Sequence, residues 1–151
     1  MSERPILCRW HHEELVLDVL PVEKHILGFT NPWYKGALNA ASSITLPSGS
    51  TISIITAPFF LGTKMEAFRG RGKNDFFASH DLEDVIAVMD GRNSIADEIS
   101  ASPSDLREYL ANAITSLLQQ ERFREALPGY VRNDERVPQI LRKLQEISRL
   151  A

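Results

Sequence analysis

The sequence predicts an α+β domain, with a small mixed or antiparallel sheet in its first part and helices after it. Up to Ile55 the apolar residues of the β-rich runs alternate with a period of two, and beyond it they recur at the helical period of 3.6. The chain has 151 residues, 43% of them hydrophobic and 25% charged, a composition typical of one globular domain. We therefore expect an α+β core over residues 1–91 and a helical region over residues 92–151 packed on it.

The first two strands are expected in short β-rich runs bounded by turn residues. Residues 6–10 form one such run, and residues 15–20 form another that ends at Pro21. Between them, the sequence His11-His12-Glu13 predicts a turn.

A loop, a short helix and a hairpin are expected next. Residues 28–34 contain Asn-Pro and predict a loop, and residues 35–41 predict a short helix. Residues 44–46 and 51–56 flank the sequence Pro-Ser-Gly-Ser and predict a hairpin with its turn. The sequence leaves the order of the strands open.

Two helices are expected between residues 58 and 91. Pro58 suits a helix N-terminus, and the first helix runs to about Arg69, where the loop at residues 70–75 breaks it. The second helix ends at Gly91, and its apolar residues recur at i, i+3, i+4 and i+7: Leu82, Val85, Ile86 and Met89.

The remaining chain is expected to be helical. Residues 102–105, Ser-Pro-Ser-Asp, resemble a capping box with proline at the first helical position, leading into an amphipathic helix. Pro128-Gly129 ends that region. Residues 137–147 predict a last amphipathic helix.

Composition excludes several classes of protein. A net charge of −3 provides no global field for nucleic acid or an anionic membrane. The single Cys8 excludes an intrachain disulfide framework and a thiol-based structural zinc site. The N-terminus lacks the apolar core of a signal peptide, and the longest apolar run, at residues 57–61, is too short to span a membrane. We expect a cytoplasmic protein with no membrane partner.

Asp18 departs from its local pattern, because it lies between aliphatic residues in a strand that is apolar on both faces. A buried carboxylate there must be paired or bound to a metal, and metal-dependent phosphoryl-transfer enzymes hold Mg²⁺ with such acids. The alternative is an edge position at which Asp18 faces water.

Lys64 departs from its pattern in the same way. On a helical wheel it lies in the apolar face, between Leu61 and Phe68. One interpretation is a lysine at the edge of the core whose ammonium group reaches water. The other is a charge directed at a carboxylate or at a nucleotide phosphate.

Asp81 and Asp84 share one side of the following helix, with His80 four residues before Asp84. Acidic residues in a first turn complement the helix dipole, and Ser79 is a suitable cap, so a structural role alone explains them. This acidic helix directly follows a basic stretch, and both can also be solvated surfaces; the basic residues are Lys64, Arg69, Arg71 and Lys73.

Two sequence patterns look like functional motifs, but we assign no binding or catalytic role to either. Residues 67–74 approach the phosphate-binding P-loop, but a helix precedes them, Ala67 replaces the first glycine and Asn74 replaces the hydroxyl residue. His11-His12 looks like a metal site, yet adjacent side chains diverge and no third ligand is evident, so we expect a solvated turn.

Three features form a set that follows a fixed order along the chain: Asp18, then Lys64-Met-Glu-Ala67, then His80-Asp-Leu-Glu-Asp84. The set resembles the nucleotidyltransferases of the DNA polymerase beta superfamily, in particular the abortive-infection (AbiEii-like) bacterial toxin group. The resemblance runs from about Arg9 to Pro128.

The resemblance implies a role for each of these residues. Asp18 matches the third metal-site carboxylate, and Lys64 matches the lysine of a K-x-x-A motif expected to hold the nucleotide phosphates. Asp81 and Asp84 match a K-D-x-x-D motif, in which His80 replaces the lysine. Further positive charge at the nucleotide is expected from Arg69, Arg71 or Lys73.

The family also has a Gly-Ser turn and an Asp-x-Asp pair before these motifs, which this sequence lacks. Two of three expected metal carboxylates are therefore missing. Asp18 alone should bind Mg²⁺ weakly, because Mg²⁺ favours water and phosphate unless an acidic cluster is preformed. We expect the chain alone to be inactive.

Three hypotheses follow. The chain is the C-terminal part of a truncated or split enzyme, transferring NMP from an NTP to an unknown acceptor (RNA is one candidate) once Mg²⁺ can bind. Alternatively, it is a non-catalytic nucleotide-binding or antitoxin-like module that pairs with itself or a partner protein through an exposed sheet edge. The third hypothesis is a helical adaptor without any nucleotide.

Overall fold

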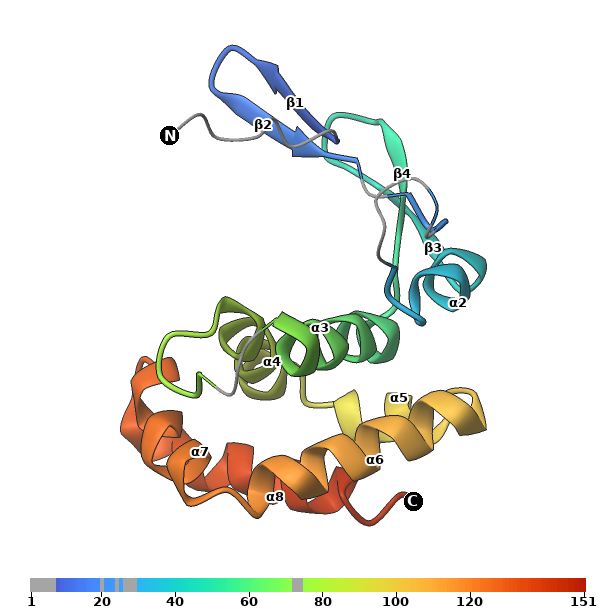
Figure 1. Ribbon diagram of the computed structural model, residues 1–151. Helices are drawn as coiled ribbons and strands as arrows, with labels where there is room; N and C mark the ends of the chain where they lie inside the picture. The colour runs from blue at the N-terminus through green and yellow to red at the C-terminus, as the bar shows by residue number, and fades with distance from the viewer. Residues whose placement is uncertain (1–7, 20, 24, 26–29, 72–74) are drawn as a thin grey trace.

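Two β-hairpins project from a body of helices (Figure 1). The computed structural model describes residues 8–19, 21–23, 25, 30–71 and 75–151. The α+β class expected from the sequence is confirmed. In chain order the elements are β1 (Arg9–His12), β2 (Leu15–Asp18), α2 (Tyr34–Asn39), β3 (Ser42–Thr45), β4 (Thr51–Ile54), α3 (Ala57–Arg71), α4 (His80–Gly91), α5 (Ile95–Ser100), α6 (Ser104–Leu118), α7 (Glu121–Ala126), η1 (Leu127–Tyr130), η2 (Asp134–Arg136) and α8 (Val137–Ile147).

Within the described residues the strands form two separate antiparallel pairs, β1–β2 and β3–β4, and not the single sheet that we expected. In β1–β2, Arg9 lies opposite Asp18, which places the turn at Glu13 and Glu14. The predicted turn at residues 11–13 is therefore wrong, because the Arg9–Asp18 pair sets a register that keeps His11 and His12 in β1. Residues 6, 7 and 20 of the predicted strands lie outside the described residues.

The second predicted hairpin is confirmed as β3–β4. Ile44 lies opposite Ile52, and the backbone N–H of Leu46 donates to the carbonyl of Ser50 at 2.8 Å across the turn. Gly49 has a φ of 85°, a conformation that glycine adopts without strain, so the sequence Pro-Ser-Gly-Ser suits this turn.

Most of the predicted helices are confirmed. The helix expected at residues 35–41 is α2, and those expected to start near Pro58 and to end at Gly91 are α3 and α4. The capping box is wrong: α6 begins at Ser104 after Pro103, with no side-chain cap, because the hydroxyl of Ser102 donates to the carbonyl of Ile99 instead. The predicted loop at residues 28–34 lies partly outside the described residues.

The hydrophobic core lies in the helical body. Among the described residues, the buried hydrophobic side chains come from residues 59–147, with Ala37 on α2 as the exception, and every residue of the four strands is exposed. Gly62 lets α3 approach α6, since a Cβ there would lie 2.8 Å from Leu106 Cδ1. No helix in the described part of the chain is both long and apolar enough to cross a bilayer.

Contacts from the C-terminal region hold both ends of α4. At its start, the backbone N–H of Ser79 donates to the hydroxyl of Tyr130, which donates in turn to the carbonyl of Phe76. At its end, the ammonium group of Lys143 donates to the carbonyls of Met89 and Arg92, where a cation also complements the helix dipole. Residues far along the chain therefore hold α4 at both ends within the helical body.

Candidate functional site

Lys64 on α3 lies between two carboxylates of α4. Its Nζ is 2.5 Å from Asp84 Oδ2 and 3.3 Å from Asp81 Oδ1. The structure thus brings together three of the residues that the sequence singled out. It also decides between the two interpretations of Lys64, because the ammonium group is directed at carboxylates and is not free in solvent.

Local sequence explains why the two acids are placed this way. The hydroxyl of Ser79 accepts a hydrogen bond from the backbone N–H of Leu82, so α4 begins at His80. Asp81 and Asp84 then fall at the start of the helix on the side that faces α3. There the helix dipole favours negative charge.

The site is partly buried and carries excess negative charge. The side chains of Lys64 and Asp81 are 25% and 10% exposed, and that of Asp84 is 43% exposed. Burial opposes the charged form of Lys64, but Asp84 and Asp81 outweigh it and hold the pKa of the lysine above its usual value. The formal charges of one ammonium group and two carboxylates add up to −1. Lys64 is fully charged, but its two neighbouring carboxylates already neutralise that charge.

A cavity of about 480 Å³ adjoins this cluster. Phe60 connects the two, because it lines the cavity and its ring centroid lies 5.6 Å from Lys64 Nζ. The other walls come from the base of the β3–β4 hairpin, the start of α3, the end of α4 and the Arg92–Glu98 ion pair; they include Ser42, Ile55, Ala57, Ala87 and Gly91. Its volume is in the range of small-molecule sites.

Asp18 lies elsewhere. Its carboxylate accepts two hydrogen bonds from the guanidinium of Arg9, at 2.7 Å and 2.8 Å, within the β1–β2 hairpin. These hydrogen bonds lower the pKa of Asp18 and raise that of Arg9. The hairpin projects away from α3 and α4 (Figure 1). The structure therefore does not bring Asp18 to Lys64, and it matches the alternative in which Asp18 faces water.

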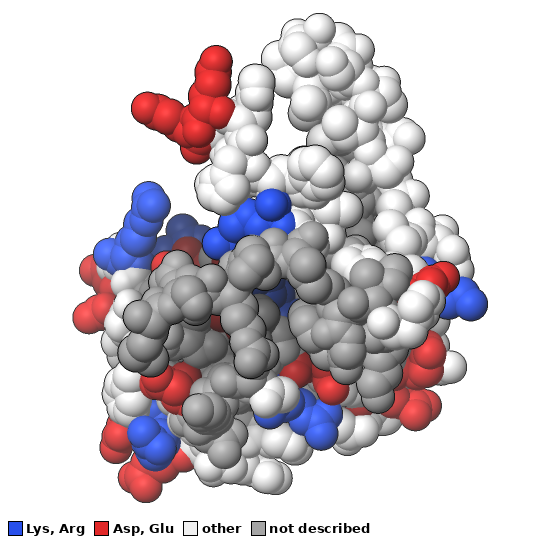
Figure 2. Space-filling model, turned by 45° about the horizontal axis from the view of Figure 1, so that its top comes forward, with Lys and Arg blue, Asp and Glu red and all other residues white. Residues whose placement is uncertain are grey.

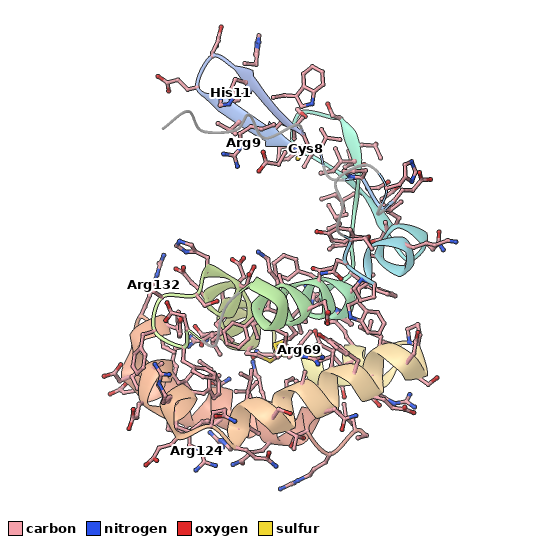
Figure 3. The ribbon with its side chains drawn as sticks, in the orientation of Figure 1. Cys8, Arg9, His11, Arg69, Arg124 and Arg132 are labelled. Atoms are coloured by element: carbon pink, nitrogen blue, oxygen red, sulfur yellow. The ribbon has the colours of Figure 1, made fainter. Side chains whose placement is uncertain are left out.

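The basic residues predicted to assist Lys64 are also elsewhere or not described. Arg69 projects toward α6 (Figure 3), with its guanidinium 5.7 Å from the ring centroid of Tyr109 and 3.8 Å from Glu66. His80 is exposed, with Nδ1 3.2 Å from Glu83. Arg71 ends α3 but its side chain is not described, and Lys73 lies outside the described residues.

The three carboxylates that the sequence singled out, Asp18, Asp81 and Asp84, do not fit a resident Mg²⁺ ion. Such an ion needs several free oxygen ligands. Both oxygens of Asp18 are bound by Arg9, while Asp81 and Asp84 are paired with Lys64. In the part of the chain that the structure describes, no three His, Cys, Asp or Glu residues are grouped so that they could hold a metal.

Sequence reasoning missed two features near the site. The cavity beside Lys64 had only a weak signal, the spacing of Ala57, Phe60 and Lys64 along one face of a helix. The second feature is Tyr109, whose hydroxyl donates to Glu66 on α3 at 2.7 Å. Tyr109 and its neighbour Arg69 also line a cavity of about 570 Å³ between α3 and α6, whose walls do not include Lys64, Asp81 or Asp84.

Comparison with known proteins identified no relative. No family model, no curated protein and no solved structure matches this chain.

Proposed function

We propose that the chain is a nucleotidyltransferase-like domain of the DNA polymerase beta type that binds a nucleotide between Lys64 and the adjoining cavity. In this proposal, NMP transfer from an NTP to an acceptor takes place only in a complete or complemented protein that supplies the missing metal carboxylates. One observation supports it above the others: Lys64 lies against Asp81 and Asp84, which are 17 and 20 residues further along the chain. The two motifs that carry the resemblance therefore meet in space.

The position of Phe60 supports a nucleotide as the ligand. A phosphate chain placed at Lys64 would lie directly beside the cavity, where the ring of Phe60 offers an apolar surface for a base. The hydroxyl of Ser42, in the same wall, is a hydrogen-bonding group for a sugar or base.

Local charge sets a condition on binding. Because Lys64, Asp81 and Asp84 sum to −1, a triphosphate is repelled unless it arrives with a divalent cation as its own counter-ion. We therefore expect tighter binding of the magnesium complex of the nucleotide than of the free anion. This cation belongs to the substrate, and we derive no catalytic step from it.

The pairing of Asp18 with Arg9 favours a second function, that of a non-catalytic nucleotide-binding or antitoxin-like module. The carboxylate of Asp18 is occupied by Arg9, and the resemblance assigns metal binding to that group. The two functions share the nucleotide site and differ in turnover, so NMP transfer to RNA, protein or small-molecule acceptors distinguishes them.

The test is thermal unfolding of the full chain with each of the four NTPs, with and without Mg²⁺. At an NTP concentration about 100 times the dissociation constant, binding stabilises the fold by about 2.7 kcal/mol, which raises the melting temperature. We expect Lys64→Ala to abolish that rise, and Lys35→Ala, at an exposed lysine of α2, to keep it.

A second variant tests the cavity separately from the lysine. Ala87 lines the cavity and is exposed, so Ala87→Trp fills the space and leaves the ion pairs of Lys64 intact. We expect it to weaken binding as well. The proposal is wrong if no NTP raises the melting temperature, or if Lys64→Ala responds as the original chain does.

A further inference from the structure

The cavity of about 570 Å³ between α3 and α6 has an apolar floor. The floor consists of lining side chains that are at most 8% exposed: Met65, Phe68, Phe76, Ala113 and Leu117. Phe68 and Phe76 are in edge contact, with their ring centroids 5.5 Å apart. The volume lies within the range of small-molecule sites, so the floor can accommodate the apolar body of a ligand.

The rest of the lining is polar and carries only positive charge. It consists of side chains from α3, α6 and the start of α7: Arg69, Tyr109, Asn112, Ser116, Gln120 and Arg122. Among the described residues, none that lines the cavity is acidic. The whole chain nevertheless has 20 acidic and 17 basic residues, and Figure 2 shows acidic and basic side chains interspersed over the helical body. The positive lining is therefore a local feature of this cavity.

The two arginines lie toward opposite ends of the cavity. Tyr109 and Leu117 both line it and are about two turns apart on α6, which corresponds to about 12 Å along the helix axis. Arg69 is directed toward α6 (Figure 3) and lies at the Tyr109 end, with its guanidinium 5.7 Å from that ring. Arg122 lies on α7, which follows the other end of α6. A ligand along the floor therefore meets one cation at each end.

The charge of only one arginine is already compensated. Arg69 lies 3.8 Å from the carboxylate of Glu66. The guanidinium of Arg122 lies 5.9 Å from the ring centroid of Phe76 and 5.7 Å from that of Phe77, and no carboxylate in the described part of the chain pairs with it. The formal charges of the two arginines and Glu66 add up to +1. One negative charge on a ligand would neutralise the cavity.

We propose that this cavity binds an amphipathic carboxylic acid, a small molecule with one carboxylate on an apolar body. The carboxylate lies at Arg122, whose planar guanidinium donates two parallel hydrogen bonds to it. The apolar body lies on the floor beside Phe68 and Leu117. This site does not depend on the proposed nucleotide site, because Lys64 is not among the residues that line it.

Calorimetric titration of the full chain with octanoate, below its micelle concentration, tests the proposal. Octanol is the matched probe without the charge, and acetate is the matched probe without the apolar body. We expect each of them to bind at least about 10-fold more weakly than octanoate, because each keeps only one of the two interactions.

Two arginine variants test the position of the carboxylate. Arg122→Gln removes the charged donor, so it should raise the dissociation constant of octanoate at least about 10-fold. Arg124→Gln is the matched control, because Arg124 is an exposed arginine on the same helix that does not line the cavity. We expect Arg124→Gln to leave the dissociation constant unchanged.

A third variant tests the cavity itself. Ser116 is exposed, and its hydroxyl donates to the carbonyl of Asn112 within the same helix, so Ser116→Trp fills the space without breaking a contact between elements. We expect it to weaken octanoate binding and to keep the circular dichroism of the helical body.

Amide chemical shifts of the ¹⁵N-labelled chain locate the bound probe. Octanoate should move the amide signals of residues 65–69 and 109–122 and leave those of the β1–β2 hairpin in place. The proposal is wrong if octanoate does not bind or if octanol binds as tightly. Equal effects of Arg122→Gln and Arg124→Gln, or shifts confined to residues outside the cavity, also overturn it.

Discussion

Lys64 on α3 and Asp84 on α4 form an ion pair with a separation of 2.5 Å between Nζ and Oδ2. Asp81, one turn earlier on α4, accepts from the same ammonium group at 3.3 Å. The lysine therefore links two helices of the core as well as forming the candidate nucleotide contact. A change at this residue must be judged by its effects on stability and on binding.

We first predict that Lys64→Ala destabilises the fold. The side chain of Asp81 is 10% exposed and loses a charged partner, which costs about 1–3 kcal/mol. The measurement is urea unfolding followed by circular dichroism. Lys35→Ala should change the free energy of unfolding by less than about 0.5 kcal/mol.

The double variant Lys64→Ala with Asp81→Asn tests the physical reason. A neutral amide at residue 81 needs no cation, so the double variant should regain part of the stability lost in Lys64→Ala. A double variant that is less stable than Lys64→Ala contradicts this account.

The second prediction contrasts two glycines of α3. Gly62→Ala places a methyl group 2.8 Å from Leu106 Cδ1 and 3.3 Å from Trp33 Cδ1, and overpacking of this kind costs about 1–3 kcal/mol. Gly70 has open space at the same position, so Gly70→Ala should instead stabilise the helix by about 0.5–1 kcal/mol. Urea midpoints that shift in the same direction for both variants would be inconsistent with close packing of α3 on α6.

The third prediction concerns alkaline pH. Burial, and then the hydrogen bond to Glu66, raise the pKa of Tyr109 from 10.0 to about 12. A raised pKa means that this contribution to stability is complete below the unfolded pKa and is lost as pH rises through the folded one. The free energy of unfolding should therefore decline between about pH 10 and about pH 12.

Comparison of two phenylalanine variants isolates the contribution of Tyr109. Tyr109→Phe should be less stable at neutral pH by about 1 kcal/mol, since it lacks the hydrogen bond to Glu66, and its decline with pH should be shallower. Tyr34→Phe keeps that bond and should follow the original chain. The pKa of Lys64 is also raised, and it lowers the free energy of unfolding at alkaline pH in the same way in every variant. Its contribution therefore cancels when the variants are compared.

The fourth prediction separates the hairpin from the core. Arg9→Gln removes the two hydrogen bonds to Asp18, so amide hydrogen exchange over residues 9–18 should become faster. The melting temperature should not change, because β1 and β2 contribute no buried residue. Arg124→Gln, at an exposed arginine of α7, is the control and should alter neither quantity.

The same pair has a defined response to acid. Hydrogen bonds from Arg9 lower the pKa of Asp18 below 3.8, so the pair is intact above that value and is lost as pH falls through the folded pKa. The protection of the hairpin amides, measured relative to their intrinsic exchange rates at each pH, should fall at that point while the helical body stays protected. Global unfolding at the same pH as hairpin opening would contradict the prediction.

Local patterns predicted much of the secondary structure and part of the site. Helical periodicity located α3 and α4 and placed Lys64 within an apolar face, where it needed a partner. Ser79 and the two aspartates marked the start of α4. The turn at residues 11–13 was predicted wrongly, because strand register depends on a cross-strand ion pair that periodicity does not encode.

The sequence by itself determined the α+β class, the approximate positions of α2, α3, α4 and α8, and the isolation of Lys64 among apolar residues, since each follows from the spacing of residues close together in the chain. Only the tertiary structure decided that Lys64 pairs with Asp81 and Asp84, that Asp18 pairs with Arg9, and that a cavity lies beside Phe60. These contacts join different elements. Their partners are selected by how the elements pack and not by local pattern.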